Sequence, residues 1–450
     1  MLKISVIGAG SGTFSIPLTR DLCHINSMQD CIISLMDINE ERLDSVYNIC
    51  VRLNNELGGS LKFEKTTDRA VSLEGADFVI TTALTASYDR LREGWEIAEK
   101  YGFRFGGSYH IMYDEAFWIN FYQFRFFEEL TLDILKYCPD AWHLLIANPV
   151  ISGVTLLQRK YPQVKMLGLC HGYSLAHDIP TYFELGKNDI TYQMPGVNHF
   201  IWMNECHLGG KPFFPFLDKW ISEKADDLWG KEYVPSALDK KRMDFYKKHG
   251  VIGVGDTMGW SGASWPWWYH TDEEVEKEFC IRSPKDDWEE LCFSIARNNT
   301  KYLHDLASDP DAKMTDHFPY NGPDIMSIVP IIESIVCDIP RVFIVNVLNK
   351  GFLVPGVPED FEVEVPALCS AAGVHPITTS PLPKTIIAHT LRDRVAPVEM
   401  ELAAYENGSL DYLKELVLMD KWAASMKQVS DFVDEILDLP YHKAMKEHYR

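Results

Sequence analysis

The first 170 residues alternate between short apolar runs and longer stretches whose apolar side chains have helical spacing. The apolar runs, which predict buried strands, are Leu2–Ile7, Cys31–Met36, Asp77–Thr82, Trp142–Ala147 and Lys165–Cys170. The helical stretches are Phe14–Ile25, Glu40–Leu57, Leu91–Tyr101, Ala116–Tyr137 and Ile151–Tyr161. Strands that alternate with helices predict an α/β fold with a parallel sheet covered on both faces.

The pattern changes after about residue 170. Ile190–Leu208 and Arg341–Pro366 have the pattern of longer strands joined by turns, whereas Glu273–Asp305 and Lys384–Tyr405 have helical spacing. No repeat, low-complexity tract or flexible linker separates the two parts. We therefore predict a second region of mixed α+β structure, residues 171–450, that packs directly on the first.

Composition narrows the possible partners and the cellular compartment. The chain has 450 residues, is 46% hydrophobic and carries a formal net charge of −22, which makes nucleic acid and anionic membrane surfaces poor partners. The ten cysteines are scattered without a C-x-x-C pair, as is typical of free thiols in a reducing cytosol. The sequence shows neither a signal peptide nor an apolar run of about 18 residues. We expect a soluble, cytoplasmic protein.

A glycine-rich turn joins the first predicted strand to the first helix. It reads Gly8-Ala9-Gly10-Ser11-Gly12-Thr13, and its third glycine comes one residue earlier than in the usual dinucleotide-binding pattern. Such glycines let the backbone approach a pyrophosphate at the amino end of a helix. The alternative is a tight strand–helix turn without a ligand. The candidate cofactor contacts are Gly8, Gly10, Ser11, Gly12 and Phe14.

Asp37 follows the second predicted strand. A carboxylate at this place accepts hydrogen bonds from both ribose hydroxyls, which favours NAD over NADP. The alternative role for Asp37 is the amino-terminal cap of the helix predicted over Glu40–Leu57.

A cysteine and a histidine are the candidate metal ligands. Cys170 ends the last predicted parallel strand, where ligands bind in open α/β sheets, and His199 follows 29 residues later. A thiolate and an imidazole suit a borderline metal such as Mn, Fe, Co or Ni. Taken singly, a cysteine such as Cys170 is more often an inert buried thiol, and a histidine such as His199 is more often a hydrogen-bonded core residue.

Seven sequence blocks, in order, resemble those of the NAD- and Mn-dependent family 4 glycoside hydrolases over nearly the whole chain. The blocks are G-A-G-S at 8–11, L-M-D-I-N-E-E-R-L at 35–43, A-D-F-V-I at 76–80, A-N-P-V at 147–150, G-L-C-H-G at 168–172, G-V-N-H at 196–199 and G-V-I-G-V-G-D-T at 250–257. The C-H-G and G-D-T blocks resemble the α-glycosidase branch. The resemblance implies a Rossmann-type NAD-binding domain over 1–170, like that of lactate and malate dehydrogenases, and a substrate- and metal-binding catalytic domain over 171–450.

The resemblance also implies the roles of individual residues. Cys170 and His199 would be ligands of Mn²⁺ or of another divalent metal such as Co²⁺, Ni²⁺ or Fe²⁺. Asp256 would be the catalytic base, and His171 the general acid.

Two further residues would contact the substrate, Asn148 near the nicotinamide and Asp114 in the active site. The implied reaction is hydrolysis of a small-molecule α-glycoside by C3 oxidation, elimination, water addition and re-reduction, without net redox change. We expect a homo-oligomer, a dimer or a tetramer.

One departure from the family bears on the sugar. Related α-glycosidases carry an arginine after G-D-T, where this chain has Gly259 followed by Trp260. Three further tryptophans follow at Trp265, Trp267 and Trp268; they could stack on sugar faces or pack in the core. A less cationic wall favours a neutral α-glucoside or α-galactoside over an α-glucuronide or α-galacturonide.

Arg104 or Arg125 could supply the missing charge for such a uronide. Two alternatives to a hydrolase remain. A hydroxy-acid dehydrogenase would need an Arg–His catalytic pair and no metal. A non-catalytic NAD-binding sensor would not need Cys170, His199 and Asp256 together.

Overall fold

The computed structural model describes residues 1–28, 30–186, 188–230, 236–258, 265–270, 272–279, 288–323 and 326–450. Its largest sheet has the strand order β12-β9-β8-β14-β13-β6-β5-β4-β1-β2-β3, with β15 beside β14. The strands of the amino-terminal part are β1 (Lys3–Ile7), β2 (Ile32–Met36), β3 (Lys62–Thr66), β4 (Phe78–Thr81), β5 (Trp142–Leu145) and β6 (Lys165–Gly168). These six strands are parallel, and their order 3-2-1-4-5-6 is that of a dinucleotide-binding Rossmann fold.

The remaining strands of this sheet pair antiparallel with their neighbours. They are β8 (Gly196–Val197), β9 (Phe200–Met203), β12 (Ile252–Val254), β13 (Arg341–Leu348), β14 (Glu362–Ser370) and β15 (Gly373–Pro376). A separate three-stranded sheet consists of β7 (Ile190–Gln193), β10 (Glu205–Leu208) and β11 (Lys211–Pro212). The predicted α/β fold with a mixed second region is confirmed.

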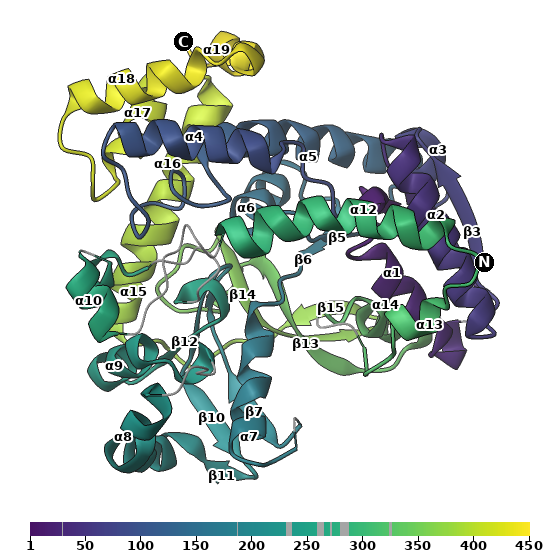
Figure 1. Ribbon diagram of the computed structural model, residues 1–450, viewed down its shortest axis with the longest axis horizontal. Coiled ribbons are helices and arrows are strands. Elements are labelled where there is room, and N and C mark those ends of the chain that lie inside the picture. The colour runs from purple at the N-terminus through teal and green to yellow at the C-terminus, as the bar shows by residue number, and fades with distance from the viewer. Residues whose placement is uncertain are drawn as a thin grey trace.

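Helices cover the sheet, and the carboxyl-terminal helices lie beside α4 at the end of the molecule that holds the carboxyl terminus (Figure 1). The helices of the first part are α1 (Ser15–Cys23), α2 (Glu40–Glu56), α3 (Arg69–Leu73), α4 (Tyr88–Lys100), α5 (Phe117–Tyr137) and α6 (Val150–Lys160). Those that follow are α7 (Asp178–Tyr182), α8 (Phe213–Trp229), α9 (Lys240–His249), α10 (Glu273–Glu278), α12 (Ser294–Ser308), α13 (Met314–His317), α14 (Ile328–Cys337), α15 (Lys384–Thr390), α16 (Ala396–Asn407), α17 (Leu410–Leu418), α18 (Met426–Leu437) and α19 (Lys443–His448). None of the described helices is long and apolar enough to cross a membrane.

The sheet is continuous across residue 170. Asn346 of β13 pairs with Gly168 of β6, and its side-chain amide donates to the Gly168 carbonyl over 3.3 Å. From the later part of the chain, α12 packs on α2, so that a Cβ on Gly12 would lie 2.7 Å from Leu303. The division into 1–170 and 171–450 therefore stays a proposal about roles.

Candidate active site

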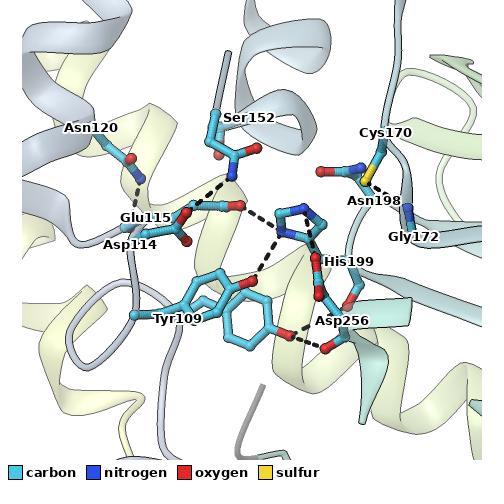
Figure 2. Close-up of polar contacts among 12 residues, drawn as sticks. Tyr109, Asp114, Glu115, Asn120, Ser152, Cys170, Gly172, Asn198, His199 and Asp256 are labelled. Carbon is cyan, nitrogen blue, oxygen red and sulfur yellow. Dashed lines mark hydrogen bonds and ion pairs between the residues drawn. The ribbon is translucent and has the colours of Figure 1, made fainter. Parts of the chain in front are cut away.

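Three turns meet beyond the carboxyl end of β6 (Figure 2). Cys170 follows β6, His199 lies at the tip of the β8–β9 hairpin, and Asp256 lies in the short helix η5 (Gly255–Thr257) after β12. One ligand atom from each of the three side chains lies within 4.8 Å of the other two. The His199 Nε2 is 3.5 Å from the Asp256 Oδ2. The fold thus brings together the three residues that the sequence singled out for metal binding and proton transfer.

Two glycines let the Cys170 turn and the Asp256 turn touch. Gly255 has φ +59°, and a Cβ on it would lie 2.6 Å from the Cα of Gly172. Any side chain at position 255 would therefore push the two turns apart. Thr257 fixes the second turn to the hairpin, because its hydroxyl both accepts from the amide of Ile201 (2.8 Å) and donates to its carbonyl (3.0 Å).

His199 has an uncommon backbone conformation. Val197 pairs with Phe200, which leaves Asn198 and His199 as a two-residue hairpin tip, and His199 has φ +57°. Few residues other than glycine occupy this left-handed region, although histidine does so more often than most, and those that do cluster at functional sites.

Two buried glutamates hold the residue before His199. The Asn198 amide N–H donates to Glu362 over 3.0 Å, and its side-chain amide donates to Glu364 over 3.1 Å. Burial raises the pKa of Glu364 to about 7 and that of Glu362 well above its ordinary value, although the Asn198 hydrogen bonds oppose both shifts. Sequence reasoning missed these glutamates. Their signal is the E-V-E-V alternation, which puts two carboxyls on one face of a strand that is otherwise apolar.

Burial and charge act in opposite directions on the cysteine–histidine pair. Burial raises the pKa of Cys170, while His199 lowers it. For His199, burial opposes the charged form, but Cys170 and Glu115 raise its pKa well above the ordinary value. A divalent cation bound between a thiolate and an imidazole would replace the protons for which these groups compete.

Three residues of the loop before α5 surround His199 and were not predicted. The Glu115 Oε1 lies 2.9 Å from the His199 Nδ1, and the Tyr113 hydroxyl lies 3.4 Å from the same nitrogen. The Tyr109 hydroxyl donates to the carbonyls of His199 (3.3 Å) and Asp256 (3.2 Å). Only the tertiary fold relates this loop to His199. The adjacent acids at 114 and 115 were the only signal in the sequence.

The two predicted substrate contacts lie together. The Asn148 side-chain amide donates to the Asp114 Oδ2 over 3.1 Å. Burial, reinforced by the neighbouring Glu115, raises the pKa of Asp114 to about 7. Asn148 follows β5 directly, so both residues lie near the carboxyl end of the parallel strands, where the fold is expected to place a ligand.

Other candidates lie apart from this cluster. His171 is next to Cys170 in the chain, but its side chain is exposed. Arg104 is exposed and stacks on Trp422, with the guanidinium carbon 5.3 Å from the ring centre. Arg125 is exposed on α5, 5.8 Å from the ring centre of Phe121 in the same helix.

The glycine turn and Asp37 contact each other. The Gly10 amide N–H donates to the Asp37 Oδ2 over 2.8 Å, and a Cβ on Gly10 would lie 2.8 Å from that oxygen. Gly8 has φ +93°, and a Cβ on it would lie 2.6 Å from the Ala83 backbone.

The turn continues through Ser11 and Gly12 to Phe14, the residue that precedes α1. The side-chain cap of α2 is Asn39, which accepts the Arg42 amide N–H over 2.9 Å. The helix-cap alternative for Asp37 is therefore wrong. The Asp37 carboxylate instead accepts the backbone amides of Gly10 and Asn39, which holds it beside the glycine turn.

The described tryptophans of this segment differ in burial. Trp265 is buried against Phe200 and Trp202, and its indole N–H donates to the Asp393 carboxylate over 2.9 Å. Trp267 and Trp268 are partly buried. For Trp265 the core-packing alternative holds. Gly259 and Trp260 lie outside the described residues.

The fold is a Rossmann sheet with a glycine turn at one strand end and a cluster of thiol, imidazole and carboxylate at another. This combination is typical of a dinucleotide-binding enzyme with an additional site for a cation. The sequence profile of the family 4 glycosyl hydrolases matches residues 3–179, and that of the family's C-terminal domain matches residues 194–423. The chain therefore belongs to family 4 of the glycosyl hydrolases and is a glycosidase. This membership decides against the dehydrogenase and sensor alternatives.

Similar proteins differ in the sugars that their names give. An α-glucosidase of Erwinia rhapontici is 24% identical, with 97% of each chain covered. An α-galacturonidase of Lachnoclostridium phytofermentans is 22% identical over 97% of this chain and 95% of its own. The crystal structure of a 6-phospho-α-glucosidase from gut microorganisms, in complex with NAD and Mn²⁺, has a TM-score of 0.78 at 18% identity and covers 99% of this chain and 98% of its own.

Proposed function

We propose that this protein is an NAD- and divalent-metal-dependent α-glycoside hydrolase of the α-glucosidase or α-galactosidase type. The observation that carries the proposal is the cluster of Cys170, His199 and Asp256 within 4.8 Å, beside a Rossmann glycine turn. The names of related proteins and the NAD and Mn²⁺ bound to a structural relative support it.

The chain's own residues fit both groups. A pyrophosphate would lie against the turn at Gly8 and Gly10, where there is no room for a Cβ, and a ribose would lie against Asp37. The thiolate of Cys170 and the imidazole of His199 would hold Mn²⁺, Co²⁺, Ni²⁺ or Fe²⁺. Under this proposal residues 1–170 bind NAD, and residues 171–450 contribute most of the substrate and metal site.

Each polar side chain of the site then has a task. When bound, NAD and the metal would supply reversible hydride transfer at C3 of the sugar and Lewis-acid polarisation of its oxygens. Asp256 would take the C2 proton, and Asn148 with Asp114 would orient the sugar hydroxyls. His171, which is exposed and follows Cys170 in the chain, would give a proton to the leaving group.

A second candidate, an α-glucuronidase or α-galacturonidase, is favoured by one buried arginine. Arg394, in the π-helical turn η8 (Leu391–Val395), is 2% exposed, and its Nε and Nη2 have no hydrogen-bond partner among the described residues. Its guanidinium carbon lies 3.3 Å from the ring centre of Tyr109, whose hydroxyl binds the backbone of His199 and Asp256. A guanidinium fork binds a carboxylate through two parallel hydrogen bonds. This residue, unlike Arg104 or Arg125, could meet the C6 carboxylate of a uronide.

The test compares nitrophenyl α-glucoside, α-galactoside and α-glucuronide as substrates, with NAD, Mn²⁺ and a reductant present. We expect kcat/KM to be highest on a neutral hexoside. A preference for the uronide of tenfold or more, roughly 1.4 kcal/mol of transition-state discrimination, would select the second candidate. In that case Arg394→Lys should lower kcat/KM on the uronide more than on the hexosides. Inactivity on all three would contradict the proposed α-glucosidase or α-galactosidase activity.

Cytoplasmic location and assembly into a dimer or tetramer remain proposals of the same kind. Free thiols support the first, since no disulfide joins any two of the described cysteines.

A further inference from the structure

A buried carboxylate lies behind the imidazole of His199. The Glu115 Oε1 is 2.9 Å from the His199 Nδ1, and the two side chains are 1% and 6% exposed (Figure 2). The opposite ring nitrogen, Nε2, faces the carboxylate of Asp256 at 3.5 Å. The ring therefore has one nitrogen turned to Glu115 and the other turned to the cluster with Cys170 and Asp256.

We propose that Glu115 is the positioning residue of the metal site: it accepts the Nδ1 proton of His199 and thereby presents Nε2 as the metal ligand. This inference rests on the proposed function. Imidazole ligands of metals almost always donate their other N–H to a carboxylate or carbonyl, which fixes both the tautomer and the plane of the ring. The Tyr113 hydroxyl also contacts Nδ1, at 3.4 Å, so the Glu115 carboxylate is the nearer of two groups at this nitrogen and the one that carries a charge.

The main chain at Glu115 is held independently of its side chain. The Asn120 side-chain amide donates to the Glu115 carbonyl over 2.8 Å and to the Glu401 Oε1 over 2.9 Å. His110, five residues before Glu115, lies 3.2 Å from the Glu401 Oε2. A change confined to the Glu115 carboxylate therefore leaves the loop anchored to α16 and reports on the contact with His199.

Two conservative variants distinguish the effect of the contact between Glu115 and His199 from the effect of the negative charge on Glu115. Glu115→Gln keeps an oxygen that can accept the Nδ1–H but removes the negative charge. Glu115→Asp keeps the charge but shortens the side chain by one methylene, which draws the carboxylate away from the ring. The matched control is Glu333→Gln. Glu333, on α14, is also a buried carboxylate, but its partners are Arg341 and Ser27 and not a residue of the metal site.

The measurements are the Mn²⁺ dissociation constant by titration calorimetry and the visible d–d and thiolate charge-transfer bands of the Co²⁺-loaded protein. NAD affinity is measured in parallel. We expect Glu115→Asp to weaken Mn²⁺ binding about 10- to 100-fold, the range found when outer-shell partners are lost, and to shift the Co²⁺ bands. Glu115→Gln should stay nearer to wild type than Glu115→Asp, and Glu333→Gln should match wild type.

Wild-type Mn²⁺ affinity in Glu115→Asp would overturn the inference. So would Glu115→Gln binding Mn²⁺ more weakly than Glu115→Asp, because charge and not contact would then be decisive. An equal loss in Glu333→Gln would reveal a general destabilisation and would also overturn it. Failure of the proposed function looks different, since the wild-type protein would bind no Mn²⁺, or Cys170→Ser would bind it as well as wild type.

Discussion

At the scale of single residues, His199 is held in a costly conformation by neighbours on both sides. A left-handed backbone costs a non-glycine residue of order 1–3 kcal/mol and persists only where the surroundings fix it. Here Glu362 and Glu364 fix Asn198, and Thr257 fixes Ile201 just beyond the tip. Because the hairpin is anchored on both sides, the imidazole can face Asp256 without relying on the flexibility of a loop.

Asp256 is the residue whose replacement tests the chemistry. If it takes the C2 proton, Asp256→Asn should lower kcat about 100-fold or more, the usual contribution of a general base. NAD affinity should be unchanged, because the proposed pyrophosphate and ribose contacts follow β1 and β2, whereas Asp256 follows β12 at the other end of the sheet. Wild-type turnover in D₂O should give a sugar that carries deuterium at C2, detected by mass spectrometry. Unlabelled product from an active enzyme would rule out proton abstraction at C2.

Residue-scale features were only partly predictable from the sequence. Cys170 was placed at the end of a predicted parallel strand, whereas Asp256 was singled out only by the family resemblance, and the structure brings both together with His199. Glu115 was missed because its contact with His199 joins segments 84 residues apart. Nothing in the local pattern distinguishes such an acid from a solvated one before the tertiary fold is known.

At the scale of elements, strands with an apolar sequence were predicted, whereas a strand with a polar sequence was missed. All five predicted parallel strands exist, each within the predicted range. β3 was missed because its sequence, K-F-E-K-T, has a single apolar residue. It lies at the edge of the sheet, where charged side chains oppose unwanted pairing with other chains. The stretch predicted as helical over Glu273–Asp305 contains α10 and α12, and residues 280–287 lie outside the described part.

The glycine turn yields an element-scale prediction. A methyl group at position 10 would lie 2.8 Å from the Asp37 Oδ2 and displace that carboxylate. Gly10→Ala should therefore raise the NAD dissociation constant tenfold or more, about 1.4 kcal/mol, as measured by fluorescence titration. Gly230→Ala is the matched control, because Gly230 has φ −80° and its Cβ would lie 3.6 Å from the nearest atom. Unchanged NAD affinity in Gly10→Ala would count against this turn as the NAD site.

At the scale of the whole molecule, one sheet and one large core join the two predicted regions. The largest apolar cluster contains residues from Ile4 to Tyr449. β13 adds to the Rossmann strands through β6, and α12 covers the glycine turn from the far part of the chain. The sequence predicted direct packing from the lack of a linker. It could not predict that β13 pairs with β6, because the two strands are 178 residues apart and nothing in either local sequence indicates the other.

Stability against acid is also a property of the whole molecule, because opposing groups are spread over it. Burial lowers the pKa of His143 and His442 to about 4. Neutral histidines of this kind favour the folded state above the unfolded pKa of about 6.5, and that stability is lost as pH falls towards the folded pKa. Burial raises the pKa of Asp420 to about 6, so its contribution has the opposite sign and is lost as pH rises. The pH profile of the wild type alone therefore mixes both effects.

A variant at His143 isolates the histidine contribution. His143, a residue of β5, is fully buried, and its Nε2 lies 2.7 Å from the hydroxyl of Thr81 on the neighbouring strand β4. A fall in its pKa from 6.5 to about 4 corresponds to roughly 3 kcal/mol of stability present near neutral pH and lost in acid. The melting temperature of wild type should therefore exceed that of His143→Gln by more at about pH 7 than at about pH 4.5. The measurement is scanning calorimetry of the metal-free proteins, with the exposed His375→Gln as control. A constant difference between wild type and His143→Gln at both pH values would show that His143 does not resist protonation in the folded state.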